Sequence, residues 1–426
     1  MDRISKLVGE IRAVSTLARA DSKSQNTKKA GKPHARLLIR MGSFAFTLAL
    51  VVSVALPGTV RAQAQCTGLL SGLRLPVGST LTDHGRLLIG ESGDGSAGSG
   101  RISIVDQNGM RRTLIDGMPS GHADVGDPSG PSGLFMQGRS LFVAIGTGDT
   151  GVLGPRPGTT LVNLKGPSSP IFHSVLAMYF SAGTEARTTG FTMTPADQQA
   201  LANGRLVWLH DSRWNFLFIR VVTKLPGFVP TPLPDVPDNI SVSNPFGIVG
   251  LGRSLYVSDG GRNLTWKVDR LSGAASAFAT FPNIPNPLFP HVGGPFQQAV
   301  PTGITVEHDK VLASLFRGAP FATGTSTIEQ IDSRTAAHAP LISGLTTAIG
   351  VIPLQGRQHR YLVLEMSASG PFFSGPGTVL RFDDPAGPPT KVADCLAAPT
   401  SMTLDRGAGI LYVTESGGNL IGIAYP

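Results

Sequence analysis

The chain has 426 residues, of which 53 are glycine and 33 are proline, and its formal net charge is +8. This length holds either two ordinary domains or one large ring of repeats, and the many turn-forming residues predict an all-β protein. Eleven of the 36 basic residues but three of the 28 acidic ones precede residue 65, so the remainder is neutral. A neutral remainder has no basic surface for phosphates, which argues against a nucleic-acid-binding protein.

Residues 1–64 have the pattern of a leader and signal peptide. Phe44–Leu56 is an apolar run that is short for a membrane span, and basic residues precede it. Ala62–Ala64 has the small-x-small pattern of a cleavage site, so we expect a mature chain that starts at Gln65 and is exported to the periplasm or the extracellular space. Met41 is an alternative first residue, and an uncleaved membrane anchor is the alternative to cleavage.

One sequence pattern recurs along the rest of the chain. Ser243–Gly261 reads SNPFGIVGLGRSLYVSDGG, which predicts a turn, a strand, a second turn, another strand and a glycine-rich loop with an acid. Related stretches begin at Pro76, Pro131, Pro245, Pro301, Thr347 and Pro399. The spacing is close to 50 residues except for one interval of about twice that length, and such a period is typical of propellers and solenoids.

These repeats predict a six-bladed β-propeller that spans residues 65–426 as a single domain, with seven blades as the alternative. The long interval then holds an insertion at about 150–242, in which the Thr-Pro-Ala-Asp sequence at 194–197 predicts a short helix near 194–204. After Pro399 the chain offers about three strands. We therefore expect the apolar segment Cys66–Leu75 to supply the fourth strand and to close the ring.

The two cysteines, Cys66 and Cys395, lie near the two ends of the predicted ring. If the N-terminal segment pairs with the last blade, the cysteines meet, and export permits a disulfide bond. Two free thiols are the alternative.

The repeated Pro-x-Gly-apolar and Leu-Tyr-Val-x-Asp/Glu-x-Gly-Gly pattern resembles NHL-type and TolB-like six-bladed propellers. More narrowly, Ser243–Asp259, Pro399–Gly418 and Gly130–Asp149 are similar to the exported ScyD/ScyE family. The resemblance implies architecture and location more than an activity.

An acid follows the second predicted strand in most copies, and these loops are expected on one face of the ring. The copy at Pro301 has Arg317 in place of the acid. Five of the acids are candidate ligands for Ca²⁺: Glu91, Asp149, Asp259, Glu365 and Glu415. A bound calcium ion would support a gluconolactonase-like hydrolase of lactones or esters. Alternatively, each acid caps the backbone amides of its own loop and binds no ligand.

The same predicted face is rich in aromatic residues. Together with Arg317, six phenylalanines are candidates for an apolar ligand site: Phe289, Phe296, Phe316, Phe321, Phe372 and Phe373. Alternatively, each ring fixes its own loop to the sheet. The favoured prediction is a monomeric binding or scaffold module for a small apolar ligand or a protein partner, with no membrane span after cleavage. The metal-assisted hydrolase is the alternative, and enzymatic activity is left open.

Overall fold

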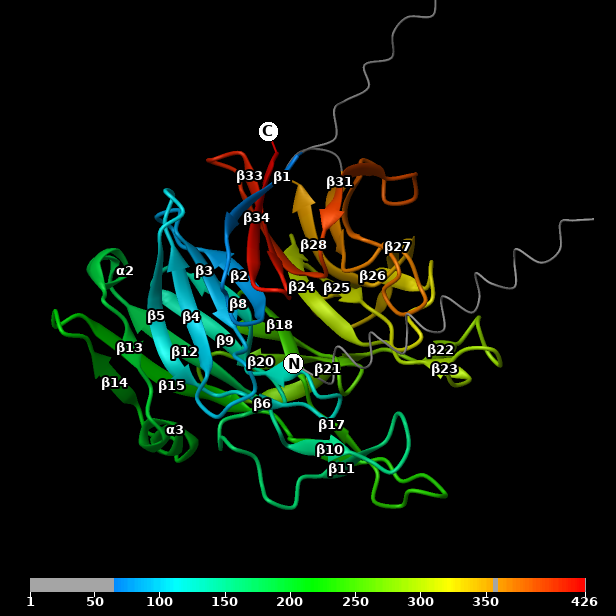
Figure 1. The fold of residues 1–426 in the computed structure, drawn as a ribbon, viewed down its shortest axis with the longest axis horizontal. Coiled ribbons are helices and arrows are strands. Elements are labelled where there is room, and N and C mark those ends of the chain that lie inside the picture. The colour runs from blue at the N-terminus through cyan, green and yellow to red at the C-terminus, as the bar shows by residue number, and fades with distance from the viewer. Residues whose placement is uncertain (1–64, 355–358, 426) are drawn as a thin grey trace, which may run out of the picture. The chain divides into compact units, whose positions relative to one another are not determined.

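The computed structural model describes residues 65–354 and 359–425, so the predicted leader and signal peptide lie outside the described residues. The described chain folds into six antiparallel sheets arranged radially (Figure 1). Each inner strand contacts the inner strands of the blades before and after it, and that of blade six contacts that of blade one. The prediction of a six-bladed β-propeller is confirmed.

Four strands make up the basic sheet of each blade, from the inner strand outward. In blade one they are β2 (Pro76–Leu81), β3 (Leu87–Glu91), β4 (Gly100–Val105) and β5 (Arg111–Met118). In blade two they are β8 (Pro131–Gln137), β9 (Ser140–Ile145), β12 (Ser174–Phe180) and β15 (Phe216–Lys224). In blade three they are β18 (Pro245–Leu251), β19 (Ser254–Asp259), β20 (Leu264–Asp269) and β21 (Ala275–Thr280).

The second half of the ring has the same order. In blade four the strands are β24 (Pro301–Glu307), β25 (Lys310–Leu315), β26 (Ser326–Asp332) and β27 (His338–Leu345). In blade five they are β28 (Ala348–Leu354), β29 (Arg360–Glu365), β30 (Gly377–Phe382) and β31 (Thr390–Leu396). Blade six consists of β32 (Pro399–Asp405), β33 (Ile410–Glu415), β34 (Asn419–Ala424) and β1 (Cys66–Leu70). The fifth copy thus starts at Ala348 and not, as the sequence suggested, at Thr347.

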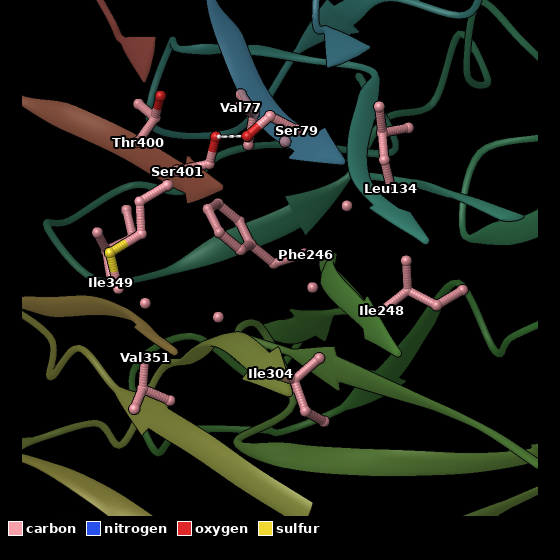
Figure 2. Close-up of a pocket in the computed structure, with 16 residues that line it drawn as sticks. Val77, Ser79, Leu134, Phe246, Ile248, Ile304, Ile349, Val351, Thr400 and Ser401 are labelled. Carbon is pink, nitrogen blue, oxygen red and sulfur yellow. Dashed lines mark hydrogen bonds between the residues drawn. The ribbon is translucent and has the colours of Figure 1, made fainter. Parts of the chain in front are cut away.

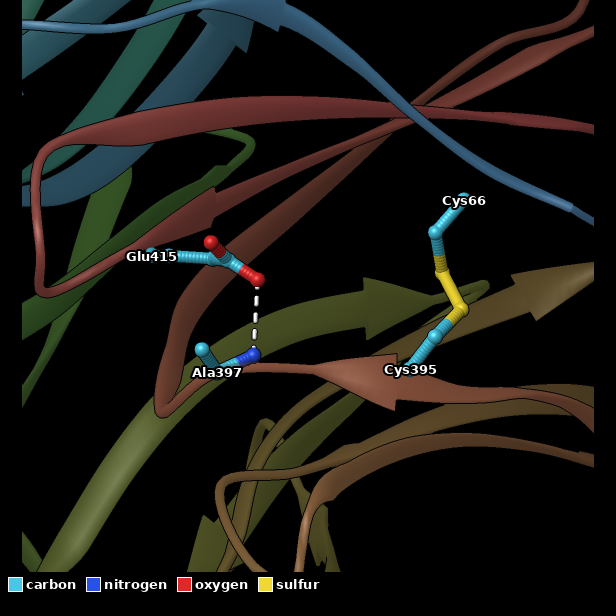
Figure 3. Close-up of a disulfide and its surroundings, with 4 residues drawn as sticks. All are labelled: Cys66, Cys395, Ala397 and Glu415. Atoms are coloured by element: carbon cyan, nitrogen blue, oxygen red, sulfur yellow. Dashed lines mark hydrogen bonds between the residues drawn. A yellow bond between two sulfur atoms is a disulfide. The ribbon is translucent and has the colours of Figure 1, made fainter.

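The ring is closed by the N-terminal strand, as predicted. β1 pairs antiparallel with β34, and Cys66 lies opposite Ile423. In Figure 1 the blue strand β1 lies beside the red strand β34. Cys66 is also bonded to Cys395 of β31 in blade five, with 6.3 Å between their Cα atoms, so the structure contains this disulfide (Figure 3). The pairing with β34 holds the segment that leads into blade one in the sheet of blade six, and the disulfide ties the same strand to blade five.

Glycine in the Pro-x-Gly pattern allows neighbouring inner strands to approach closely. A Cβ atom at Gly78 or Gly133 would clash with a backbone oxygen of the next blade. At Gly247 the same atom would lie 2.6 Å from the Thr302 carbonyl oxygen. The repeat therefore has glycine here because a side chain would push the blades apart. Outside the ring axis, six apolar clusters fill the six interfaces between consecutive blades.

The insertion between the second and third repeats extends two blades. It adds β13 (Phe191–Thr192) to blade one and β14 (Val207–His210) to blade two. The predicted helix is α3 (Pro195–Ala202), which has a capping box between Thr194 and Asp197. A second helix, α2 (Ala182–Arg187), was not predicted. None of the helices in the described part is long and apolar enough to cross a bilayer.

Four short hairpins project from the ring. They are β6 (Gly121–His122) with β7 (Pro128–Ser129), β10 (Gly151–Leu153) with β11 (Thr160–Val162), β16 (Phe228–Pro230) with β17 (Ile240–Val242), and β22 (Ile284–Pro285) with β23 (Phe296–Gln297). Each lies in a segment that joins one regular strand of the ring to the next. These segments vary between the blades, whereas the four-stranded core does not.

Candidate functional site

The repeated glutamates lie at the junctions between blades. Glu91, Glu365 and Glu415 each end the second strand of a blade and lie opposite the first residue of its inner strand. Each carboxylate accepts a hydrogen bond of 2.7 Å from the backbone N–H two residues before that strand. Figure 3 shows this contact between Glu415 and Ala397. The repeated glutamate is thus used to fix the entry of the chain into its own blade.

The backbone at these junctions explains why a carboxylate is needed there. The residue before the inner strand is left-handed in blades one, five and six, where Leu75, Thr347 and Ala398 all have φ of +47°. A non-glycine residue with this φ is strained and persists only when its surroundings hold it in place. A charge-assisted hydrogen bond to the preceding N–H supplies part of that support.

Glu91 is the most heavily bonded of these acids. Its carboxylate is buried, forms an ion pair with Arg101 and accepts a hydrogen bond from the Ser103 hydroxyl. The guanidinium of Arg111 lies 3.7 Å from the same carboxylate. Every contact is with a residue of blade one or its entry segment, so Glu91 is part of the internal structure of the blade.

Asp259 does the same in blade three with a shorter side chain. It accepts hydrogen bonds from the Asn244 N–H at 2.7 Å and the Trp266 indole at 2.9 Å, and another from the Ser243 hydroxyl. Burial raises the pKa of Asp259, while these hydrogen bonds oppose the rise. Burial likewise raises the pKa of Glu365, against the bonds from the Thr346 N–H and the Thr378 hydroxyl.

The fifth predicted ligand, Asp149, lies beyond the end of β9 and is bound by the N–H and hydroxyl of Ser168, at 2.8 and 3.0 Å. The expected ring of carboxylates around one cation is therefore not formed. Among residues 65–354 and 359–425 there is no group of three or more His, Cys, Asp or Glu residues that could hold a metal ion. The acids bind groups within the chain, as in the alternative prediction, but Glu91, Glu365 and Glu415 cap the segment that enters the blade and not the loop that follows them.

Blade four departs from this pattern. Its junction residue Val300 is also left-handed, with φ of +49°, but no acid of blade four caps it. Instead the Asn263 side chain of blade three accepts a hydrogen bond of 2.9 Å from the Val300 N–H. The segment after β25 is thus free of the capping role, and it carries Phe316 and Arg317 instead of an acid.

The structure brings four of the six predicted phenylalanines together. Phe316 and Phe321, after β25, meet Phe372 and Phe373, after β29, with ring centroids 4.3 to 6.4 Å apart. Phe316 is buried, whereas Phe372 and Phe373 are 48% and 42% exposed. We call these four residues the aromatic cluster. The cluster exposes two apolar rings to water above the buried ring of Phe316 and the partly buried ring of Phe321.

The two loops that carry the aromatic cluster hold each other in place. The Phe372 N–H donates to the Pro320 carbonyl at 3.1 Å, and the Gly370 N–H donates to the Thr323 hydroxyl at 2.8 Å. Phe321, Phe372 and Phe373 all have positive φ, between +53° and +58°. Bulky residues in this conformation are uncommon, and such strain concentrates at functional sites.

Phe289 and Phe296 lie apart from the aromatic cluster. Both are exposed, and in the described part of the chain neither ring contacts another aromatic ring. The side-chain amide of Asn286 holds their loop together by donating to the carbonyls of Val292 and Gly294. A Cβ at Gly293 would lie 3.1 Å from Pro320, so this loop runs beside that of blade four.

Two buried donors beside the aromatic cluster lack a partner. Arg317 is 6% exposed and Gln297 is fully buried. The Nε of Arg317 donates to the Thr325 carbonyl, and the Thr325 hydroxyl donates to Gln297, but Arg317 Nη1 and Gln297 Nε2 have no hydrogen-bond partner among residues 65–354 and 359–425. Burial lowers the pKa of Arg317. Unpaired buried donors are uncommon and favour an acceptor supplied from outside the chain.

The channel along the ring axis contains a cavity of about 110 Å³. Figure 2 shows apolar residues that line it on the inner strands β18, β24 and β28: Phe246, Ile248, Ile304, Ile349 and Val351. Hydroxyl groups line the cavity only where blades one and six meet, and there the Oγ atoms of Ser79 and Ser401 are 2.9 Å apart. The residues that line this cavity are apolar or hydroxyl-bearing, and they include no acid, base or histidine.

His173 is a buried ionisable residue that the sequence did not single out. Its Nδ1 donates to the Ser243 carbonyl at 2.8 Å, so its Nε2 accepts from the Thr150 hydroxyl at 2.7 Å. Burial lowers the pKa of His173 to about 4, against a smaller opposing effect of the bond to Ser243. The residue ties the long loops of blade two to the start of blade three, and no motif in the sequence marks it.

Comparison with known proteins gives structural likeness only. No protein-family model matches this chain, and no sequence among the curated proteins matches it. Virginiamycin B lyase from Staphylococcus aureus is 13% identical, with 85% of this chain and 99% of that chain covered and a TM-score of 0.43.

Two further solved structures cover the same share of this chain. A protein from Xanthomonas campestris described as a gluconolactonase is 10% identical, with 90% of that chain covered and a TM-score of 0.46. The PQQ-bound aldose sugar dehydrogenase from Streptomyces coelicolor is 13% identical, with 98% of that chain covered and a TM-score of 0.44. At these values the likeness does not indicate an activity for this chain.

Proposed function

We propose that this protein is a binding module that presents the aromatic cluster to a small, flat, apolar ligand or to an apolar segment of a partner protein. The observation that carries the proposal is the exposure of Phe372 and Phe373, which stand on the buried ring of Phe316 and the partly buried ring of Phe321. Exposed aromatic rings on a rigid base offer a large contact area at a small cost in conformational entropy.

The unpaired donors beside the aromatic cluster add a polar element to this site. A ligand oxygen that accepted from Arg317 Nη1 and Gln297 Nε2 would satisfy both groups. Such a ligand would place an apolar body on the rings and a carbonyl or similar acceptor toward blade four. This division between an apolar area and a few placed polar groups is typical of small-molecule sites.

We also propose that the protein is exported, as its resemblance to the ScyD/ScyE family implies, and that it acts as a monomer. The apolar run at Phe44–Leu56 and the bond between Cys66 and Cys395 support export, because disulfides persist mainly in oxidising compartments. The hydrolase alternative has no comparable support, since its carboxylates do not converge in the described part of the chain.

The test is a fluorescence titration with Nile red, a flat neutral fluorophore, in the wild-type protein and a Phe372→Ala/Phe373→Ala variant. The proposal predicts saturable binding that weakens by about tenfold or more in the variant, because two contact rings are lost. Phe289→Ala is the matched control, since it removes an equally exposed ring outside the aromatic cluster and should leave binding unchanged. Equal binding by all three proteins would refute the proposal.

A further inference from the structure

A second aromatic surface lies on the outer part of blade two, away from the aromatic cluster. Tyr179, Phe218 and Trp208 lie directly opposite one another on the adjacent strands β12, β15 and β14. Their side chains are 51%, 38% and 60% exposed. Since neighbouring strands are about 4.8 Å apart, the row spans roughly 10 Å. Figure 1 shows these strands at the outer edge of the blade.

The row is uncovered because blade two is wider than blade three. Nearer the ring axis, the same face of blade two packs against blade three through Phe142 and Ala177. Blade three ends where its β20–β21 turn meets β15, with Gly273 against the backbone of Val222. The fifth strand of blade two, β14, extends past this point, so the aromatic row borders a step between the two blades.

The loop from β14 to β15 adds a rigidly held tryptophan. The buried carboxylate of Asp211 accepts hydrogen bonds from the backbone N–H groups of Thr189, Arg213 and Asn215, at 2.9 Å each. This network holds Trp214 at φ of +59°. Its ring stacks on His210 at 5.0 Å with an interplanar angle of 10°, and the side chain is 71% exposed. One face of the indole is therefore covered and the other is open.

The segment that carries most of this surface has more basic than acidic residues. From Arg205 to Lys224 the chain has four basic residues and one acid, which is the buried and fully bonded Asp211. Arg213 is exposed beside Trp214, and Arg220 follows Phe218 on the same face of β15. This local excess stands out because residues 65–426 as a whole carry equal numbers of acidic and basic residues.

We propose that this surface, formed by Tyr179, Trp208, Trp214 and Phe218 with Arg213, binds an acidic polysaccharide. The C–H faces of a sugar ring are flat and apolar and stack on aromatic rings, and the length of the row suits about two sugar rings in a chain. The carboxylates of uronic acids complement the arginines. This surface is separate from the aromatic cluster, where the proposed function places its ligand, so either proposal can fail while the other holds.

The structure favours this occupant over three others. The leader at residues 1–64 is itself basic and would be repelled by the same charges. Residues that insert into a bilayer lie on parts of a protein that protrude from it. The aromatic row instead lies on a sheet, beside the step formed by blade three. A second copy of the chain would bring together two surfaces with the same positive charge.

The experiment is affinity gel electrophoresis of the protein in gels containing polygalacturonate, with dextran gels as the neutral control. The proposal predicts retardation by polygalacturonate alone, weakened by about tenfold in Trp208→Ala and Trp214→Ala because each loses a stacking contact. Arg213→Ala should weaken binding and reduce its dependence on salt. Phe372→Ala/Phe373→Ala should bind polygalacturonate like the wild type.

Circular dichroism melting establishes that each variant is folded, and Tyr179→Phe is a conservative variant that should retain binding. Absence of retardation in the wild type would overturn the proposal, as would equal retardation by dextran or unchanged binding in both tryptophan variants. Sedimentation that shows a dimer lost in Trp208→Ala, or binding to phosphatidylglycerol vesicles without binding to polygalacturonate, would also overturn it.

Discussion

Blade six and blade four use the same position of the repeat for different purposes. In blade six the second strand ends in Glu415, which caps the backbone N–H of Ala397, whereas the second strand of blade four ends in Leu315. In blade four the capping role passes to Asn263 of the neighbouring blade, and the corresponding loop carries Phe316 and Arg317. The difference teaches that the repeated acids maintain the fold, while blade four, which lacks one, has a loop available for binding.

Removing a capping acid is expected to cause the largest loss in the free energy of unfolding. Glu91→Ala leaves Arg101 and the Arg74 N–H without their partner in a buried site. We expect a loss of about 3–5 kcal/mol in the free energy of unfolding, as for a broken buried ion pair. Urea denaturation measures it. A loss below about 1 kcal/mol, the range of an exposed pair, would show that the acid is not needed for the fold.

The next largest effect on the free energy of unfolding is expected from His173. This residue belongs to blade two, which also lacks an acid at the end of its second strand. The pKa of His173 is lowered to about 4 in the folded protein, from 6.5, so the unfolded chain binds more protons between these values. Stability should therefore be fully present above pH 6.5 and fall by roughly 3 kcal/mol as the pH drops to 4.

Urea denaturation between pH 7 and 4 checks this prediction, with His173→Asn as the control. Asparagine tolerates the left-handed backbone of this position, φ +57°, and does not titrate. The variant should lose this part of the pH dependence. An identical pH profile in both proteins would show that His173 is not the group responsible.

The cap that blade four borrows from blade three should have a smaller effect. Asn263→Ala removes the acceptor of the Val300 N–H, which is a neutral hydrogen bond, so we expect a loss of about 1–2 kcal/mol. The same denaturation series measures it. Asn263→Asp keeps an acceptor at this position and should retain most of the stability. A larger loss in Asn263→Ala than in Glu91→Ala would reverse the proposed ranking of charged and neutral caps.

The repeat made most of the fold predictable. A period near 50 residues, with Pro-x-Gly at four of the six inner strands, was sufficient to place six blades, and the apolar segment from Cys66 placed the closing strand. The helix α3 was also predictable, because its capping box is local. The parallel strand β13 was missed since its two residues depend on a partner in blade one that no local pattern marks. The glycines of the inner strands were more reliable signals, because neighbouring blades approach so closely there that a side chain does not fit.

The candidate site was harder to predict because it depends on which backbone groups the side chains meet. The sequence places Glu365 and Glu415 at equivalent positions, which suits both a metal ring and a set of caps. Only the left-handed junction residues, with their preceding N–H groups turned toward the acids, decide between the two. The contact between Phe321 and Phe373 joins two blades, and neither loop indicates it alone.

The smallest effect on stability, and the most direct test of the central claim, is expected in the aromatic cluster. Nile red affinity and thermal unfolding should be measured together in Glu415→Gln and in Phe372→Ala/Phe373→Ala. We predict that Glu415→Gln unfolds at a lower temperature but keeps its affinity for the dye, while the phenylalanine variant keeps its unfolding temperature and loses affinity. Loss of affinity in Glu415→Gln, with none in the phenylalanine variant, would contradict this account.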